Sequence, residues 1–241
     1  METVIFDWTY RGLALALAVL LVGACAVSAR SILVGAAGWA RNGSVGLLLA
    51  GLGLLASLVV GVGLQAARPV TGDVAYQVVH FAVFYAGFAL VLLGSARLAG
   101  PGRPDGSSPA ARSSRTRWLI GAVLFAAVTA FSSWRLVQGA LTASGAGGAM
   151  RQEVSFFLPV LLSLVLAAAV AASGAIRSTG ARQRACWWFT AFAGLILVGF
   201  LREASILPSL EPLVDLLAAF GPFVLGGAAV YRAARVTAAG S

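Results

Sequence analysis

Seven stretches of the chain are apolar enough, and long enough or nearly so, to cross a membrane. The hydrocarbon core of a bilayer is about 30 Å thick, and a helix needs about 20 apolar residues to span it. Of the 241 residues, 60% are hydrophobic and only 10% are charged, far outside the composition of soluble domains. The sequence therefore predicts an all-α integral membrane protein, a bundle of seven transmembrane helices in one domain. The predicted spans are residues 12–29, 45–67, 74–96, 118–141, 154–176, 185–201 and 213–231.

Arginine is distributed unequally between the two ends of the predicted bundle. The chain contains no lysine, so all 17 of its basic side chains are arginines. Twelve of them flank the spans on one side, four flank the other side, and Arg135 lies within a span. Cytoplasmic loops carry the excess of arginine, and seven of the eight acidic residues fall at or near the opposite end. We therefore predict a protein of the cell membrane with its N-terminus outside and its C-terminus in the cytoplasm.

The two cysteines lie near the predicted cytoplasmic ends of their spans. Cys25 closes the sequence LVGAC, residues 21–25, which resembles a bacterial lipobox and would make the first run a cleaved signal. Cleavage would place the arginine-rich loops on the wrong face, so we expect the first run to remain as a span. Cys186 shares the reducing side of the membrane with Cys25, and we expect two buried thiols rather than a disulfide.

The longest connection, residues 98–117, is rich in glycine, proline, serine and arginine and is predicted to be a flexible cytoplasmic loop. The net charge of +9 and the pI near 11.2 would also suit a protein that binds nucleic acid. Because the arginines lie between hydrophobic runs, however, we expect their partners to be the anionic headgroups of membrane lipids and not nucleic acid.

Two features of the spans bear on helix packing. Gly53, Ser57 and Gly61 recur at four-residue spacing, and small residues at this spacing let another helix approach closely. Such a stripe serves either packing within the chain or the seam of a homodimer or another membrane partner. Pro159 and Pro222 each remove a backbone donor and are predicted to kink their helices.

Several spans carry polar side chains at the level of the outer membrane surface. Arg135 lies about 26 Å along the fourth span from its cytoplasmic start. A buried charge needs a partner, and we predict a polar, water-accessible pocket that opens outward between the third, fourth, sixth and seventh spans. A structural ion pair between Arg135 and Asp215 is the alternative. The candidate ligand-binding or proton-relay residues are Gln77, His80, Arg135, Gln138, Arg202, Glu211 and Asp215.

His80 is the only histidine of the chain. It is either a satisfied core or interfacial side chain, a group that exchanges protons, or a ligand to haem or metal. One histidine cannot ligate a haem from both sides, and the sequence has no histidine, cysteine and carboxylate cluster with zinc spacing. Walker, dinucleotide, GxSG, HExxH and CxxC motifs are absent too. We therefore expect no cofactor, no metal and no catalytic residue, and an enzyme is the less expected class.

Seven spans with an external N-terminus is also the layout of the microbial rhodopsins. The stretch VDLLAAFG, residues 214–221, resembles the pattern of their seventh helix, and places Asp215 at the counter-ion position and Ala219 at the position of the retinal lysine. Because the chain has no lysine, it cannot form a retinal Schiff base. A rhodopsin-like scaffold without that linkage, a pigment or haem carrier, or an intramembrane enzyme is a third functional possibility.

The layout is similar as well to the sugar-transporting family in which two three-helix repeats are joined by a fourth helix. The spans within residues 12–96 and 154–231 would then form the repeats. The Pro-Gln dipeptide of that family is absent, and the first span has no proline that would correspond to Pro159. We therefore assign the chain to neither family.

Two hypotheses from different functional classes lead. In the first, the chain is a transporter or transport-like protein that binds a small, possibly anionic, solute or a proton in the outward-opening pocket. In the second, it is a non-enzymatic receptor or an accessory subunit of a membrane complex, and its helix surfaces contact a partner. A transporter should act as a purified single species, whereas a subunit should co-purify with other chains.

Overall fold

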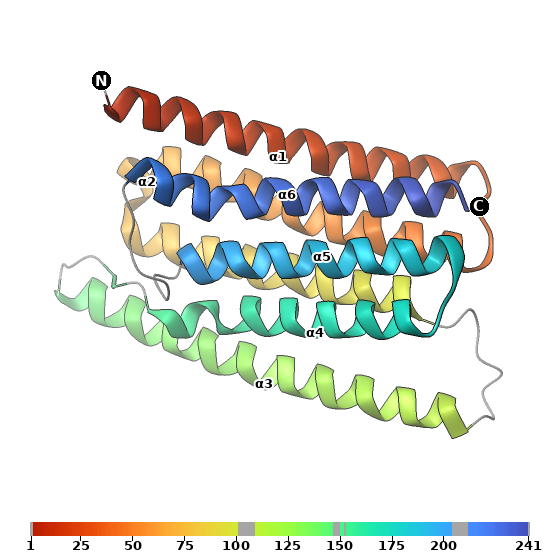
Figure 1. The fold of residues 1–241 in the computed structure, drawn as a ribbon. Coiled ribbons are helices and arrows are strands. Elements are labelled where there is room, and N and C mark those ends of the chain that lie inside the picture. The colour runs from red at the N-terminus through yellow and green to blue at the C-terminus, as the bar shows by residue number, and fades with distance from the viewer. Residues whose placement is uncertain (1, 101–108, 147–149, 152, 204–211, 241) are drawn as a thin grey trace.

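The computed structural model describes residues 2–100, 109–146, 150–151, 153–203 and 212–240, and these residues form helices and connections without a strand (Figure 1). Seven segments of the helices are long and apolar enough to cross a membrane, which confirms the predicted fold class. The chain is thus a multi-pass membrane protein. Its helices are α1 (Glu2–Leu33), α2 (Gly38–Ala99), α3 (Pro109–Ala146), the short 3-10 helix η1 (Val154–Phe157), α4 (Leu158–Ile176), α5 (Gly180–Glu203) and α6 (Pro212–Ala238).

Helix α2 supplies two of the seven spans because the chain reverses direction inside it. The first arm of α2 is Gly38–Gly63, and the second arm is Asp73–Ala99. Gly46 near the start of the first arm touches Gly94 near the end of the second arm, so the two arms run antiparallel (Figure 1).

Glycines let these two arms approach more closely than helices with larger side chains can. A Cβ atom on Gly53 would overlap the carbonyl oxygen of Gly87, and one on Gly46 would overlap that of Gly94. On each arm the two glycines are seven residues apart, so they recur on the same face after two helical turns. Backbones in such close contact gain van der Waals energy, which is one of the driving forces for helix association in lipid. We call this contact the glycine seam.

The predicted stripe of small residues lies in the glycine seam. The Ser57 hydroxyl donates a hydrogen bond of 2.9 Å to the Gly53 carbonyl and lies against Gly87, while Gly61 faces His80. Ser57 is only 4% exposed. The stripe therefore packs within the chain, while a homodimer or another membrane partner stays a prediction.

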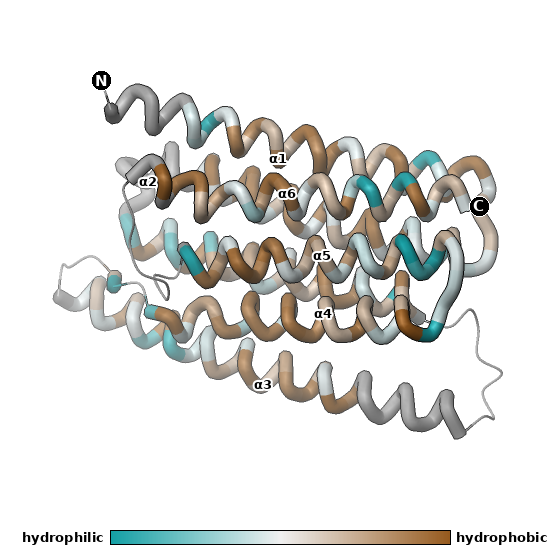
Figure 2. Tube along the Cα trace, in the orientation of Figure 1, coloured by the Kyte–Doolittle hydropathy of each residue, from teal (hydrophilic) through white to brown (hydrophobic). Residues whose placement is uncertain are grey.

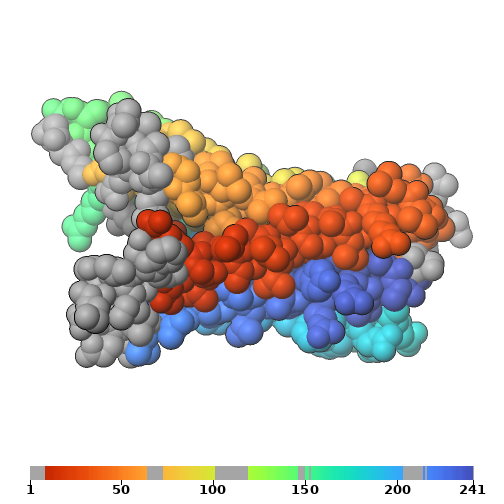
Figure 3. Space-filling model, turned by 90° about the horizontal axis from the view of Figure 1, so that it is seen from above, coloured from red at the N-terminus to blue at the C-terminus, as the bar shows by residue number. Residues whose placement is uncertain are grey.

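The remaining helices form a bundle around the two arms. Helix α1 lies between the first arm of α2 and α6 (Figure 3), and α4 packs against α5 and α2. Helix α3 lies at the edge of the bundle (Figure 1). Only 11% of its most apolar 18-residue stretch is buried. Hydrophobic residues recur along the length of the helices (Figure 2), and large apolar side chains such as Leu15, Val59 and Val123 are exposed, as a surface in contact with lipid requires.

Two local predictions need correction. The predicted loop 98–117 is shorter because α3 already begins at Pro109, where proline suits the first turn of a helix; residues 101–108 of that loop lie outside the described residues. Pro159 does not kink a helix, since it stands in the first turn of α4, whereas Pro222 does lie inside α6.

The two ends of the chain lie at opposite ends of the bundle, as an odd number of spans requires (Figure 1). We call the end at which α1 begins the N-terminal end. Helix α6 and the second arm of α2 also begin there, because the spans alternate in direction. The placement of this end outside the cell remains a prediction from the distribution of arginine.

Candidate functional site

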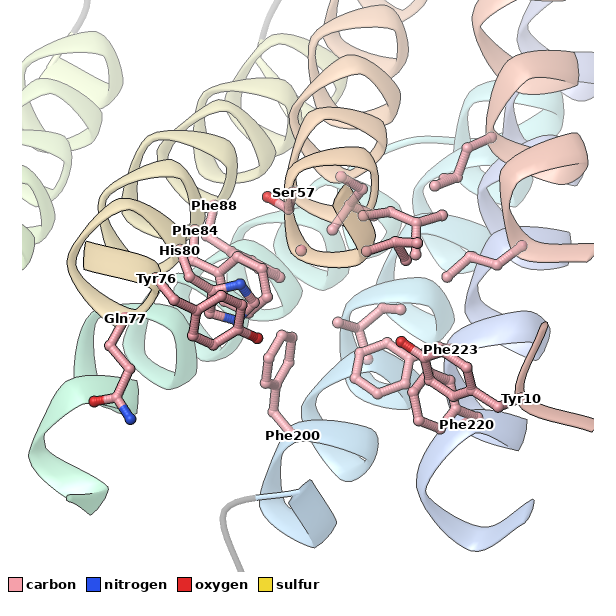
Figure 4. A pocket seen from close by; sticks show the side chains of 17 residues that line it. Tyr10, Ser57, Tyr76, Gln77, His80, Phe84, Phe88, Phe200, Phe220 and Phe223 are labelled. Atoms are coloured by element: carbon pink, nitrogen blue, oxygen red, sulfur yellow. The ribbon is translucent and has the colours of Figure 1, made fainter. Parts of the chain in front are cut away.

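A cavity of about 400 Å³ lies inside the bundle toward its N-terminal end (Figure 4). Its walls come from α1, both arms of α2, α5 and α6. Eight of its 17 lining residues carry aromatic rings, so ring faces and edges dominate the wall. These eight are Tyr10, Tyr76, His80, Phe84, Phe88, Phe200, Phe220 and Phe223.

One wall is a single face of the second arm of α2. Tyr76, His80, Phe84 and Phe88 follow one another at four-residue steps, which keeps them on one side of a helix. Of these four residues, only His80 was predicted from the sequence as a candidate site residue. From Tyr76 to Phe88 the helix rises about 18 Å. Phe88 lies just past the midpoint of the second arm, so the cavity reaches the middle of the span.

The opposite wall consists of aromatic side chains from three other helices. Phe200 of α5 packs edge-on against Phe84 of the second arm and Phe223 of α6, with ring centroids 5.7 and 5.1 Å apart. Tyr10 of α1 meets Phe220 of α6 in the same manner at 4.9 Å. Sequence reasoning missed all four of these wall residues, because an aromatic side chain in an otherwise apolar span carries no signal that distinguishes cavity from lipid.

His80 is the most polar group of the aromatic stripe. Its imidazole is stacked on Tyr76, with centroids 5.3 Å apart and an interplanar angle of 21°, and lies 4.1 Å from the ring of Phe84. Gly61 of the first arm leaves room for it, since a Cβ atom there would be 3.2 Å from the imidazole Cε1. The Nδ1 atom is buried and has no hydrogen-bond partner among the described residues. His80 is thus packed between aromatic rings and Gly61, while the hydrogen-bonding capacity of Nδ1 is unused in the described part of the chain.

Gln77 borders the cavity but does not point into it. Its side chain is directed away from the labelled rings (Figure 4), and its Nε2 donates a hydrogen bond of 3.2 Å to the Met150 carbonyl. About two helical turns further along the same face, the Tyr85 hydroxyl donates to the Phe156 carbonyl at 2.8 Å. Both bonds satisfy backbone groups of the segment that leads into α4, and such groups need partners inside a membrane. We therefore assign Gln77 a structural contact.

Arg135 lies outside the cavity, which corrects the predicted pocket. Its Nη2 forms an ion pair of 2.8 Å with Oε2 of Glu153, and the two side chains are 38% and 41% exposed. The Ser155 hydroxyl donates to the same carboxylate oxygen at 3.1 Å. The fourth predicted span is α3, which lies at the edge of the bundle, so Arg135 faces the turn before α4 instead of the cavity. Sequence alone could not show this, because it does not specify which way a span is rotated.

The other predicted site residues are dispersed as well. Gln138 is exposed on α3, and Arg202 is partly buried near the end of α5 without lining the cavity. Glu211 and the side chain of Asp215 lie outside the described residues, so the predicted Arg135–Asp215 pair stays a prediction. In the described part of the chain, Arg135 pairs with Glu153.

The Arg135–Glu153 pair carries a prediction for the dependence of stability on pH. The hydrogen bond from Arg135, together with that from Ser155, lowers the pKa of Glu153 below its ordinary value of 4.5. A carboxylate with a lowered pKa stabilises the fold above its ordinary pKa, and this contribution disappears as the pH falls through the folded-state value. We expect Arg135→Gln to lower the melting temperature only slightly near neutral pH, because both side chains are well exposed.

The difference in melting temperature between the parent and Arg135→Gln should shrink as the pH falls below 4.5 and vanish in stronger acid. Arg135→Lys, which keeps the charge, is the matched control. Its melting temperature near neutral pH should lie between those of Arg135→Gln and the parent protein. A large loss of stability in Arg135→Gln that persists unchanged in acid would show that Arg135 has a role other than pairing with Glu153.

Metal-binding side chains do not converge at the cavity or elsewhere in the described part of the chain. Across residues 2–100, 109–146, 150–151, 153–203 and 212–240, no group of three or more histidine, cysteine, aspartate or glutamate side chains is placed to hold a metal ion. Cys25 and Cys186 are buried free thiols.

Comparison with known proteins does not place the chain in a family. No protein-family model, no curated protein and no solved structure matches it.

Proposed function

We propose that this chain is a transporter-like, multi-pass protein of the cell membrane that binds a small solute in the cavity between α1, α2, α5 and α6. The observation that carries the proposal is the cavity itself, about 400 Å³ in volume and extending to the middle of the span. Protein interiors are packed as densely as organic crystals, with few voids larger than a water molecule. Pockets of this size are typical of sites for small molecules.

The lining supports a neutral solute rather than an anion. None of the 17 lining residues, all of which lie in the described part of the chain, is an arginine, aspartate or glutamate. A charged solute at this depth would have no counter-charge, and an unpaired charge inside a membrane is costly. The arginine on which an anionic solute would have depended is paired with Glu153 at the edge of the bundle.

Transport is supported by the depth of the cavity and by a proline beside it. Transporters commonly bind solute near the middle of the bilayer, between helices that move against one another. Pro222 lies inside α6 between two cavity residues, Phe220 and Phe223, and removes a backbone hydrogen bond there. A helix interrupted beside its solute can bend at that point.

Filling the cavity should weaken the binding of a solute. Leu58 lines the cavity, whereas Leu52 on the same arm is 45% exposed on the outer face. We expect Leu58→Trp to weaken the binding of fluorene, a neutral planar hydrocarbon, by at least tenfold, because the larger side chain occupies the space of the solute. Leu52→Trp makes the same change toward lipid and should bind like the parent. The measurement is saturable binding to purified protein in lipid nanodiscs, corrected for partition into empty nanodiscs.

Equal binding of fluorene by the two tryptophan variants would contradict the proposal. A loss of binding in Leu58→Trp counts only if the variant keeps the melting temperature of Leu52→Trp. Binding by the purified chain alone would also separate a transport-like protein from a subunit that needs its partner.

The second candidate function, a receptor or accessory subunit, is favoured by the position of α3. Nearly all of the most apolar 18-residue stretch of this helix is unburied. A surface of this kind faces either lipid or another membrane protein. A subunit should leave the membrane with another chain in stoichiometric amount after mild detergent extraction. A single purified species that binds fluorene would exclude this alternative as the sole function.

A further inference from the structure

The two nitrogens of His80 are in different environments. In the described part of the chain, Nδ1 is buried without a hydrogen-bond partner and faces the first arm of α2, where a Cβ atom on Gly61 would be 3.5 Å away. Nε2 is not a buried atom of this kind. Because His80 lines the cavity and Nδ1 is turned toward Gly61, we take Nε2 to be the ring nitrogen that a solute reaches.

This difference determines where a neutral imidazole carries its proton. A neutral ring has one N–H donor and one bare nitrogen that accepts. A buried donor without an acceptor is rarer in proteins than an under-used acceptor, and leaving a donor unpaired costs its full desolvation penalty. The bare nitrogen therefore belongs at Nδ1 and the proton at Nε2. The imidazolium form is disfavoured, since the lining has no carboxylate to pair with it.

The shape and chemistry of the remaining wall favour flat rings. Phe200 stands across the cavity from the stacked pair of Tyr76 and His80 (Figure 4), and Phe84 and Phe223 flank it edge-on. Aromatic rings prefer offset-stacked or edge-to-face contacts with other rings. An apolar cavity of about 150 Å³ suffices to hold a benzene molecule, so the cavity of about 400 Å³ has room for two or three fused rings.

We propose that the cavity takes a neutral, planar aromatic compound that carries a carbonyl group, and that the Nε2–H of His80 donates a hydrogen bond to the carbonyl oxygen. This inference rests on the proposed function, because it assigns the class of solute to the same cavity. It assigns His80 the role of distinguishing solutes with an acceptor from those without one. The aromatic walls contribute affinity for any flat ring.

Three tricyclic compounds of nearly the same outline test this inference. Fluorene has no hydrogen-bonding group, 9-fluorenone has a carbonyl acceptor, and carbazole has an N–H donor. In nanodiscs we expect the parent protein to bind 9-fluorenone about tenfold more tightly than fluorene, and carbazole no more tightly than fluorene. The carbonyl stretching band of bound 9-fluorenone should lie at lower wavenumber than that of 9-fluorenone in empty nanodiscs.

His80→Phe keeps an aromatic ring at the site and removes the donor. We expect this variant to bind 9-fluorenone and fluorene equally and to show no shift of the carbonyl band. Thr142→Val removes a hydroxyl from the exposed face of α3, far from the cavity wall, and should behave like the parent protein.

Each other outcome overturns a distinct statement. Equal binding of 9-fluorenone and fluorene by the parent, or a preference that survives in His80→Phe, would overturn the solute class and leave the cavity as a site for flat rings. Tighter binding of carbazole would overturn the assignment of the proton to Nε2 and with it the carbonyl. No saturable binding of any of the three compounds would overturn the proposed function itself.

Discussion

Gly53→Ala should lower the free energy of unfolding by about 1–3 kcal/mol, the usual effect of forcing extra atoms into a packed interior. The added methyl group would overlap the Gly87 carbonyl oxygen and lie 3.1 Å from the Leu90 Cβ. Backbone atoms cannot rotate away as the end of a side chain can, so the two arms of α2 must separate. The measurement is unfolding of the purified protein by sodium dodecyl sulfate in mixed micelles, followed by circular dichroism.

Gly63→Ala on the same arm is the matched control, because a Cβ atom there has no neighbour within 4 Å. Both substitutions replace a helical glycine, which by itself should stabilise a helix by about 0.5–1 kcal/mol. The difference between the two variants therefore isolates the glycine seam. If Gly53→Ala proved as stable as Gly63→Ala, the two arms would not be in the contact described above.

Phe81→Ala should destabilise the protein by about 3 kcal/mol, the lower part of the range for removal of a buried phenylalanine. Phe81 is fully buried, and its ring packs edge-on against Phe156 and Phe157 of η1 at 5.3 and 5.2 Å. Its removal leaves a cavity where the second arm of α2 meets the start of α4. The same unfolding assay in mixed micelles gives the magnitude.

Phe131→Ala tests whether packing or hydrophobicity is responsible for the loss of stability expected in Phe81→Ala. Phe131 lies on α3 and is 48% exposed on a face that we assign to lipid. In a membrane the surroundings of an unfolded helix are as apolar as the protein interior, so only the loss of packing should matter. We expect Phe131→Ala to change the stability by less than about 0.5 kcal/mol. Similar losses in the two variants would contradict the packing described for Phe81.

Part of the candidate site followed from the sequence. Gln77 and His80 of the third span were predicted as site residues from the sequence, and both border the cavity. Arg135 was predicted to line the same pocket because it lies at a depth in the membrane similar to that of His80. Depth follows from counting residues along a helix, but the direction in which Arg135 points depends on how α3 packs, and α3 packs at the edge of the bundle.

The sequence by itself determined the seven spans, because each span must independently match the thickness of the hydrocarbon layer. Which helices touch was decided only by the tertiary structure. Spans that are apolar on every face do not show which face meets protein and which meets lipid, as the exposed Phe131 and the buried Phe81 illustrate. The glycine seam and the opposite wall with Phe200 depend on contacts between segments far apart in the chain, and these exist only once the bundle has formed.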